Sequence, residues 1–494
     1  MLLRLSVFRR FPVFFLALAI VVTATAAQPE RPNIVFIMTD DHAAYAVSGS
    51  DRLPGIQSPG FDRLKREGAV FNNAFVTTSI CSPSRATALT GLHSHASGVI
   101  QNQPRVDPDP ELPFVSELLR ESGYTTAFIG KWHMEGSDRP RRGFDYWYAF
   151  EGQGRYYNPV MNENGERSEV EGYTTDILTD RAIEWMEAHG EEGPFCLFLW
   201  HKAPHVPLEP APRHRNLYDD LPIPVPPNWG DTFVDKPAHY RRGAEFGNIV
   251  RRWKEGEGEP TPEAVPPPEP WISQGNNHML NRIRTYLECQ QAVDEGIEHV
   301  LDALEETGLG ENTLVLYTSD NGMNLWAHHY TPDKRTAWEE SIRIPLLIRL
   351  PGLVTPGTEI DAIALNTDFM PTFLELAGVE PPGHLHGRSL VPLLRGEATD
   401  WRKSMLYMYH QHWRTIGFPT LLATRTDRYK YVHLPEDEEH FDELYDLKND
   451  PYELRNLFAL PEYADLVESM QKRLREHLTA VDYDKPAPQI GYQP

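Results

Sequence analysis

The chain has 494 residues, of which 40% are hydrophobic and 11% aromatic, and this suffices for one large domain or for a large domain and a small one. The formal net charge is −24 at pH 7. Because binding to nucleic acid phosphates requires a basic face, this charge argues against nucleic acid as the partner. An anionic group can still bind in a locally basic pocket.

Residues 1–27 are predicted to be a secretory signal peptide. Arg4, Arg9 and Arg10 form its basic start, residues 11–22 form a short apolar run, and small residues at 24–27 offer a cleavage site. The apolar run is too short for a comfortable membrane span, and a retained anchor is the alternative interpretation. Since no other long apolar stretch follows, we expect a mature protein without a membrane span, exported to the periplasm or the extracellular space.

Short apolar runs alternate with helical patterns as far as residue 318. The runs cover residues 33–38, 125–129, 195–200 and 313–318, and the helical patterns cover residues 113–122, 175–189 and 283–306. Near-continuous apolar runs are typical of strands that are buried on both faces of a parallel sheet. The alternation therefore predicts an α/β fold with a large, doubly wound, mostly parallel sheet and helices on both faces.

Composition divides the rest of the chain. Residues 28–396 are predicted to form the main domain, and residues 397–494 a smaller C-terminal α+β domain with an antiparallel sheet. Strand-like alternation at 404–409 and 429–433, followed by a helical pattern at 463–481, supports the second domain. Residues 206–275, rich in proline and acidic residues, are interpreted as a surface excursion that contributes to a pocket wall, with padding or partial disorder as the alternative.

Three cysteines, Cys81, Cys196 and Cys289, are too few for a disulfide framework. Cys196 lies in an apolar run and Cys289 in a helical pattern, so both are predicted to be core thiols, with a disulfide between them as the alternative. Cys81 has polar neighbours and precedes a helical pattern that begins near Ser84. Ser82 or Ser84 is expected to cap that helix, which makes Cys81 a candidate nucleophile or metal ligand rather than a core residue.

In open parallel sheets, ligands bind beyond the carboxyl ends of the strands. Asp40 and Asp41 follow the first predicted strand, and Asp320 and Asn321 follow the strand at 313–318. Adjacent carboxylates repel each other unless a cation or strong donors separate them, and an all-oxygen set suits Ca²⁺, or less readily Mg²⁺, rather than zinc. The sequence therefore predicts a metal site here, although a turn or a helix cap is the alternative for either pair alone.

Basic side chains follow two other predicted strands. Lys131 and His133 come after the strand at 125–129, and His201, Lys202 and His205 come after the strand at 195–200. A single residue of this kind is usually solvated in a loop. Together, beside a metal, these residues predict a site that neutralises a tetrahedral oxyanion and its leaving group.

The segment Cys81-Ser82-Pro83-Ser84-Arg85, followed by Leu89-Thr90-Gly91, matches the Cys-x-Pro-Ser-Arg signature of the type I sulfatases of the alkaline phosphatase superfamily. The resemblance runs from Arg31 to Pro451, nearly the whole mature chain. In that family a formylglycine-generating enzyme oxidises the motif cysteine to Cα-formylglycine. The resemblance thus implies that Cys81 is modified in this way, and that residues 28–396 are a sulfatase catalytic domain.

The resemblance also implies roles for the other polar residues. Asp40, Asp41, Asp320 and Asn321 resemble the calcium ligands of the family, completed by the modified Cys81. Arg85 is similar to the residue that orients the formylglycine hydrate, and Lys131 and His133 match the pair that contacts the hydrate and the sulfate. His205 matches a histidine near the leaving oxygen. Lys334 is similar to a lysine that binds a sulfate oxygen, but Asp333 and Arg335 stand where the family often has glycine.

The implied reaction is hydrolysis of a sulfate ester. One hydroxyl of the hydrate attacks sulfur, with Asp320 as the candidate proton acceptor, and His205 or Lys334 protonates the departing alcohol. The second hydroxyl then releases sulfate and restores the aldehyde, with His133 as the base.

The substrate is less well indicated. The segment from Asp40 to Ser50 is loosely similar to bacterial glycan sulfatases, including N-acetylglucosamine-6-sulfatase-like members, which implies a sulfated oligosaccharide or polysaccharide. Candidate sugar contacts form two clusters, which are Arg155, Tyr156 and Tyr157, and His410, His412, Trp413 and Arg414. The alternative for the second cluster is a surface loop. Two other functions stay open, a phosphodiesterase or phosphonate monoester hydrolase of the same superfamily and a non-catalytic glycan-binding protein.

Overall fold

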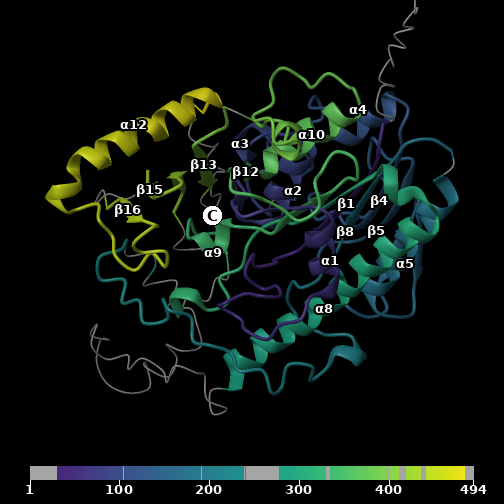
Figure 1. The fold of residues 1–494 in the computed structure, drawn as a ribbon, viewed down its shortest axis with the longest axis horizontal. Coiled ribbons are helices and arrows are strands. Elements are labelled where there is room, and N and C mark those ends of the chain that lie inside the picture. The colour runs from purple at the N-terminus through teal and green to yellow at the C-terminus, as the bar shows by residue number, and fades with distance from the viewer. Residues whose placement is uncertain are drawn as a thin grey trace, which may run out of the picture. The chain divides into compact units, whose positions relative to one another are not determined.

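A ten-stranded, mostly parallel sheet forms the centre of the computed structural model (Figure 1). The structure describes residues 31–103, 105–190, 192–237, 240, 277–329, 334–398, 400–410, 419–435 and 441–483. Its central strands run parallel in the order β9 (Thr313–Ser319), β1 (Asn33–Thr39), β8 (Phe195–Trp200), β4 (Thr125–Lys131) and β5 (Tyr146–Phe150). The first four of these are the strands that the apolar runs predict.

The sheet becomes mixed at both edges. Next to β9 lie β10 (Leu346–Arg349), β2 (Ala69–Phe71) and β11 (Thr358–Ile360), with antiparallel pairing on both sides of β10. Next to β5 lie β6 (Val160–Glu163) and β7 (Glu166–Glu169), both antiparallel to their neighbours. A separate parallel pair consists of β3 (Ala74–Phe75) and β12 (Ala364–Leu365).

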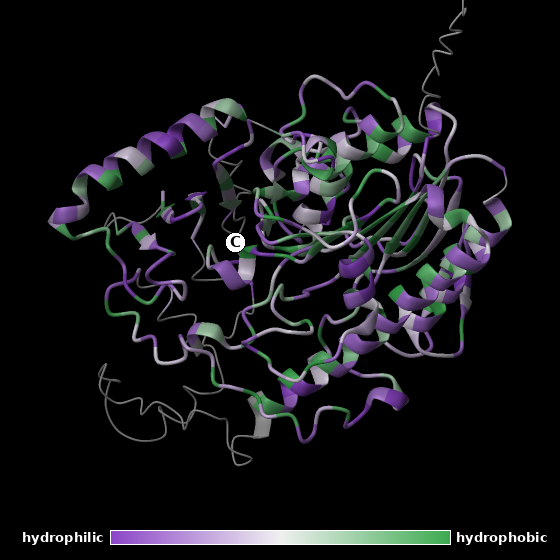
Figure 2. Ribbon diagram, in the orientation of Figure 1, coloured by the Kyte–Doolittle hydropathy of each residue, from purple (hydrophilic) through white to green (hydrophobic). Residues whose placement is uncertain are grey.

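Each central strand contributes to two cores. In β1, Phe36 and Met38 pack into one core, and Val35 and Ile37 pack into the other. The first core is covered by α2 (Cys81–Thr90), α4 (Val115–Glu121) and α10 (Phe369–Leu376), and the second by α1 (Pro59–Glu67), α5 (Thr174–His189) and α8 (Asn277–Glu306) (Figure 1). Because both faces are buried, these strands need apolar residues at successive positions, and Figure 2 shows them as largely hydrophobic.

Three of the other described helices are short. They are α3 (Ser94–Ser97), α9 (Glu339–Ile342) and α11 (Val391–Leu394), with 3₁₀ turns η1 (Pro212–His214), η2 (Leu309–Asn312), η3 (Ala327–His329), η4 (Asn366–Asp368) and η5 (Pro461–Tyr463). No helix among the described residues has both the length and the apolar character that crossing a membrane requires.

A second sheet lies in the C-terminal part of the chain and is antiparallel throughout. Its strands are β13 (Ser404–Tyr409), β14 (Leu421–Thr426), β15 (Tyr429–His433) and β16 (Glu443–Asp446). Leu406 and Met408 face helix α12 (Ala464–Ala480), whereas Tyr407 and Tyr409 face a core that includes Trp338 beside α9. This alternation of faces is the physical reason for the period-2 pattern in the sequence.

The helix at the cysteine motif differs from the prediction. It begins at Cys81 rather than near Ser84, its N-cap residue is Ile80, and no side chain caps it. The Ser82 hydroxyl instead donates to the backbone oxygen of His133 at 2.8 Å, and the Ser84 hydroxyl accepts from the Asn366 amide at 2.9 Å. The prediction of a serine cap is therefore wrong, because tertiary partners use both hydroxyls.

All three cysteines are free and buried. Cys196 lies in the core on one face of the large sheet and Cys289 in the core on the other. The sheet separates the two thiols, so they are core thiols as predicted, and the alternative of a disulfide between them is wrong.

The described part of the predicted excursion, residues 206–237 and 240, contributes to a core. Tyr218, Ile223 and Trp229 are buried in a cluster with Ile283 and Tyr286 of α8. This packing excludes simple padding for these residues, and the rest of the excursion lies outside the described residues.

Candidate active site

The carboxyl ends of the parallel strands bring the predicted acidic residues together. The register pairs Thr39 of β1 with Ser319 of β9, so the residues that follow them leave the sheet at the same level. The Asp320 amide donates to the Thr39 oxygen at 3.0 Å. One carboxylate oxygen from each of Asp40, Asp41 and Asp320 lies within 4.8 Å of the others, and all three residues are buried.

Asp41 is held in an unusual backbone conformation. Its φ angle is 70°, in the left-handed region that residues other than glycine rarely adopt. Its amide donates to Asp320 Oδ1 at 3.1 Å, and Asn321 Nδ2 donates to Asp41 Oδ1 at 2.6 Å. These bonds tie Asn321 to the acidic cluster, where the sequence predicts it.

Cys81 is fully buried, but its side chain has polar neighbours. Its Sγ atom lies 3.5 Å from Asp40 Oδ1 and 3.0 Å from Lys334 Nζ. Lys334 also contacts Asp41. Burial raises the pKa of the Cys81 thiol, and the Lys334 charge opposes that rise. Cys81 has the polar contacts that are expected of a residue outside the core. Its side chain is nevertheless as buried as that of a core residue.

Arg85 connects helix α2 to the acidic cluster. Its Nε and Nη2 atoms both donate to Asp320 Oδ2, at 3.0 and 2.8 Å, and Nη1 donates to the Lys131 oxygen at 2.6 Å. The guanidinium also lies over the ring of Trp200, 5.3 Å from its centre. A planar guanidinium with fixed donors suits this role, because it orients the carboxylate and the end of strand β4 together.

Lys131 and His133 reach the cluster from the end of β4. Lys131 Nζ contacts Asp40 Oδ2 and lies 2.5 Å from Gln153 Oε1. Gln153 Nε2 in turn lies 2.9 Å from His133 Nε2. Burial, helped by the Lys131 charge, lowers the pKa of His133 well below its ordinary value. Gln153 is missing from the sequence prediction, and its only signal there is a flanking glycine on each side.

His205 also lies at the cluster, with a ring nitrogen within 4.8 Å of Cys81 Sγ and an Asp40 carboxylate oxygen. Its Nδ1 lies 2.5 Å from the Val206 oxygen, to which it must donate, and its Nε2 faces Asp41 Oδ2 at 3.7 Å. Burial, together with the charges of Lys131, Lys334 and Lys202, lowers the pKa of His205 well below its ordinary value. Burial also lowers the pKa of Lys202 to about 8.

The candidate sugar contacts are only partly brought to the site. Tyr156 is buried, donates to the His205 oxygen at 2.8 Å and lies under Lys202 Nζ, so it supports His205 rather than lining a sugar surface. Arg155 is exposed and lies 4.0 Å from Glu169. His410 is buried, and neither of its ring nitrogens has a hydrogen-bond partner in the structure as described. His412, Trp413 and Arg414 lie outside the described residues.

The donor set fits a hard divalent cation. Three carboxylates and one amide come together, and no sulfur or imidazole other than Cys81 and His205 is grouped with them among the described residues. The three carboxylates face three cations, since Asp41 meets Lys334, Asp320 meets Arg85, and Asp40 meets Lys131 and, at 3.8 Å, Arg85. The charges of these side chains balance, so a bound divalent cation would give the site a net positive charge. That charge would attract the anionic group of a sulfate ester.

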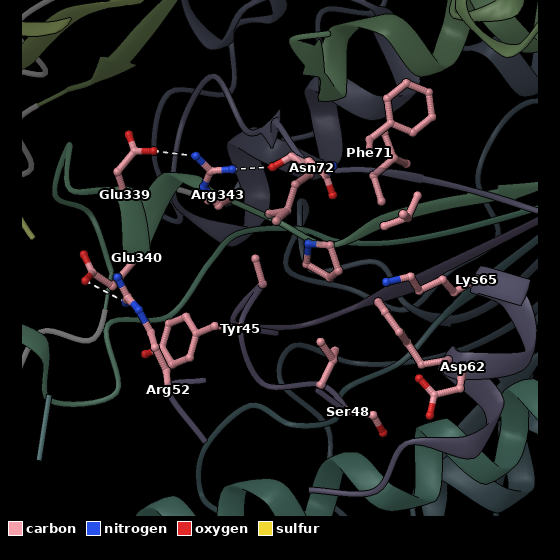
Figure 3. Close-up of a pocket in the computed structure, with 17 residues that line it drawn as sticks. Tyr45, Ser48, Arg52, Asp62, Lys65, Phe71, Asn72, Glu339, Glu340 and Arg343 are labelled. Atoms are coloured by element: carbon pink, nitrogen blue, oxygen red, sulfur yellow. Dashed lines mark hydrogen bonds and ion pairs between the residues drawn. The ribbon is translucent and has the colours of Figure 1, made fainter. Parts of the chain in front are cut away.

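A separate cavity of about 310 Å³ lies elsewhere, lined by parts of α1, β2, α9 and β10 (Figure 3). Its Arg52 is paired with Glu340 and its Arg343 with Glu339, each at 2.8 Å. Its described lining includes none of the predicted site residues. This cavity is therefore separate from the acidic cluster.

Comparison with known proteins identifies the family of this chain. The chain matches the family model described as Sulfatase over residues 32–379, and the model described as N-sulphoglucosamine sulphohydrolase, C-terminal, over residues 327–480. It is 33% identical to the N-acetylglucosamine-6-O-sulfatase of Bacteroides thetaiotaomicron, over 94% of this chain and 89% of that protein. It is 29% identical to human N-acetylglucosamine-6-sulfatase, over 81% of this chain and 71% of that protein.

Solved structures of similar proteins have the same fold. A structure described as a complex with its substrate D-glucosamine-2-N,6-O-disulfate has a TM-score of 0.82 and 32% identity, covering 93% of this chain and all, 100%, of that chain. A phosphonate monoester hydrolase from Silicibacter pomeroyi shares the fold, with a TM-score of 0.72 and 23% identity over 91% of this chain and 95% of that one. Fold and site together define a hydrolase, and the match over residues 32–379 shows that the chain belongs to the sulfatase family. Its activity is the hydrolysis of sulfuric esters.

Proposed function

We propose that this sulfatase releases 6-O-sulfate from a sulfated N-acetylglucosamine or glucosamine residue of a glycan, with Ca²⁺ and a formylglycine at position 81. The observation that carries the mechanism is the placement of Cys81 Sγ between Asp40 and Lys334 at the acidic cluster. The substrate rests on similarity, because two relatives named for N-acetylglucosamine 6-sulfate and one structure named for a 6-O-sulfated glucosamine match most of the chain.

Asp40, Asp41, Asp320 and Asn321 would hold the calcium ion, with the modified residue 81 as a further ligand. The bound ion would supply positive charge against the sulfate oxygens. Arg85 would keep Asp320 in place through its two bonds to Oδ2. Magnesium is the less suitable ion, because it requires stricter octahedral geometry.

Oxidation of Cys81 by a formylglycine-generating enzyme would give an aldehyde whose hydrate supplies a hydroxyl nucleophile and a second hydroxyl for release of sulfate. Lys131 and Lys334 would bind the sulfate oxygens. The ammonium group of Lys131 lies beside Asp40, and that of Lys334 lies beside residue 81. Both oxygens of Asp320 already accept hydrogen bonds, whereas Asp40 Oδ1 faces Cys81 Sγ at 3.5 Å. We therefore place Asp40 beside Asp320 as an acceptor for the hydroxyl proton.

His205 would hold the proton for the leaving oxygen. Since Nδ1 donates to the Val206 oxygen, Nε2 is the nitrogen that faces the site. Lys334 is the second candidate for this step, although its contacts with Asp41 and Cys81 favour a sulfate-binding role. His133 would accept the proton of the second hydroxyl.

The remaining assignments extend this proposal. Residues 1–27 would direct export to the periplasm or the extracellular space, and residues 28–396 and 397–494 would form the catalytic and the smaller domain. Arg155, His412 and Trp413 are retained as candidate sugar contacts.

The decisive experiment is mass spectrometry of the Cys81 peptide from protein produced with its maturation enzyme. Conversion of cysteine to formylglycine lowers the mass by about 18 Da, the difference between the two residues. The same sample is then assayed with glucosamine 6-sulfate, N-acetylglucosamine 6-sulfate and the 2-N,6-O-disulfate. An unmodified thiol in an active sample would contradict the mechanism, and activity on other sulfate positions alone would contradict the substrate.

A phosphonate monoester hydrolase is the second candidate function, because an enzyme of that activity shares the fold. A matched pair of phenyl phosphonate and phenyl sulfate separates the two. We expect the higher kcat/KM for the sulfate.

A further inference from the structure

One side chain joins two predicted catalytic residues without being predicted itself. The Gln153 amide spans the gap between Lys131 and His133, with Oε1 at 2.5 Å from Lys131 Nζ and Nε2 at 2.9 Å from His133 Nε2. Lys131 also contacts Asp40, so Gln153 extends the polar network of the site from the acidic cluster to His133.

The loop after β5 is shaped to present this side chain. Gly152 and Gly154 flank Gln153, with φ angles of 62° and 64°. A Cβ atom on Gly154 would lie 2.5 Å from the Phe150 ring, and one on Gly152 would lie 3.0 Å from Arg105 Nη1. Two glycines in the left-handed conformation therefore let the chain reverse tightly and direct the amide toward the end of β4.

Chemistry determines which way the amide faces. The Lys131 ammonium can only donate, so the amide atom beside it must be the oxygen, and the NH₂ group must face His133. An NH₂ group can only donate, so His133 Nε2 must accept and carries no proton. The imidazole proton is then on Nδ1, which lies 3.4 Å from Ser82 Oγ. Ser82 can accept it, because its own hydroxyl donates to the His133 oxygen at 2.8 Å.

We propose that Gln153 is a positioning residue of this sulfatase, which fixes His133 in the tautomer with an unprotonated Nε2 and ties it to Lys131. The inference rests on the proposed function, in which His133 accepts a proton, since only a nitrogen without a proton can do so. In that step the hydroxyl replaces the Gln153 amide as the donor to Nε2. Lys131 is kept beside Asp40 by the same side chain.

Two substitutions separate the two contacts. Gln153→Glu keeps the size and an acceptor for Lys131, but its carboxylate can bond His133 only if Nε2 carries a proton. Gln153→Met keeps a similar volume and removes both bonds. Gln57→Glu, at an exposed position, controls for the added charge.

We expect Gln153→Glu to lower kcat on the sugar sulfate by roughly 10- to 100-fold with KM within about 3-fold, since the loss of a base costs rate rather than binding. Gln153→Met should lower kcat and also raise KM, because Lys131 loses its bond to residue 153 and keeps only its contact with Asp40. Wild-type kcat in Gln153→Glu would overturn the proposal.

A second measurement does not depend on turnover. The ¹⁵N spectrum of histidine-labelled protein carrying Cys81→Ser, assigned by comparison with His133→Asn, reports which His133 nitrogen is protonated. We expect an unprotonated Nε2 with Gln153 and a protonated Nε2 with Gln153→Glu. A proton on Nε2 in the presence of Gln153 would overturn the inference. If no form hydrolyses a sulfate ester, the proposed function fails, and this spectrum still decides the role of Gln153.

Discussion

The Lys334 ammonium lies 3.0 Å from Cys81 Sγ, although 253 positions separate the two residues in the chain. Lys334 is the residue whose flanking sequence departs from the sulfatase pattern, since Asp333 and Arg335 flank it and the glycine that often does so is absent. Burial lowers the pKa of Lys334, but the negative charges of Asp41, Cys81 and Asp320 together outweigh this effect, and the net pKa is raised. Lys334 is thus a charged lysine beside residue 81, as the proposed binding of sulfate requires. The change in its flanking residues does not displace its side chain from the site.

Cys81→Ala is expected to abolish hydrolysis, because the maturation enzyme then has no thiol to oxidise. The loss should exceed about 10³-fold, as for removal of a nucleophile in other covalent enzymes. Cys196→Ala is the matched control, since Cys196 is also a fully buried free thiol. It should keep kcat and lose only a little stability. Equal activity of the two variants in a sulfate-release assay would reject the nucleophile.

Calcium is expected to stabilise the folded protein, because three buried carboxylates converge at the site. At a calcium concentration 100 times Kd, the free energy of unfolding should increase by about 2.7 kcal/mol. Differential scanning fluorimetry with a chelator and with added CaCl₂ measures this effect. Asp41→Asn should remove most of it, and a wild-type melting temperature that ignores calcium would count against the metal site.

Glu339 is expected to matter for stability far more than an exposed acid does. Its carboxylate accepts from Arg425 at 3.0 Å through two nitrogens and from Lys430 at 3.2 Å, which links the small sheet to α9. Glu339→Gln leaves the buried Arg425 without this carboxylate, while Lys430 keeps its ion pair with Glu453 at 2.6 Å, and loss of a buried ion-pair partner costs about 3–5 kcal/mol.

The control for Glu339 is Glu476→Gln. Glu476 pairs with Lys472 at 3.8 Å, both side chains are exposed, and pairs of this kind contribute at most about 1 kcal/mol. Urea unfolding of both variants gives the comparison. Similar losses would show that the Glu339 network does not hold the small sheet in place.

Acid is expected to destabilise the protein through His386. Burial and the charge of His95 lower the pKa of His386 from 6.5 to about 4, and its Nδ1 accepts from the His93 amide at 3.0 Å. Below pH 6.5 the unfolded chain binds a proton that the folded chain does not, so this stability is lost as pH falls from about 6.5 to about 4.

Comparison with His386→Asn isolates this effect from other titrating groups. Asparagine offers an acceptor near the position of Nδ1 and does not titrate. The wild type should lose free energy of unfolding relative to the variant between pH 7 and pH 4, as measured by denaturant titration. A constant difference across this range would show that His386 is not the group responsible.

Much of the fold could be predicted because its signals are local. The apolar run at 195–200 predicts the bounds of β8, since a strand buried on both faces requires a continuous apolar run. The predicted serine cap at Ser82 or Ser84 is wrong because the partners of these side chains are not local. Both hydroxyls bond residues far away in the chain, His133 and Asn366, and these partners outweigh the local preference for a cap.

The motif from Cys81 to Arg85 by itself determined the family of this protein, and together with the acids that follow two apolar runs it predicts most of the residues of the candidate site. Which atoms meet was decided only by the tertiary structure. Asp41 reaches Asp320 across 279 positions because β1 and β9 lie in register, and Gln153 reaches Lys131 and His133 because two glycines reverse the chain beside β4. A sequence pattern records the chemistry of each side chain, but distances between remote residues arise only when the sheet sets its register and the helices pack on it.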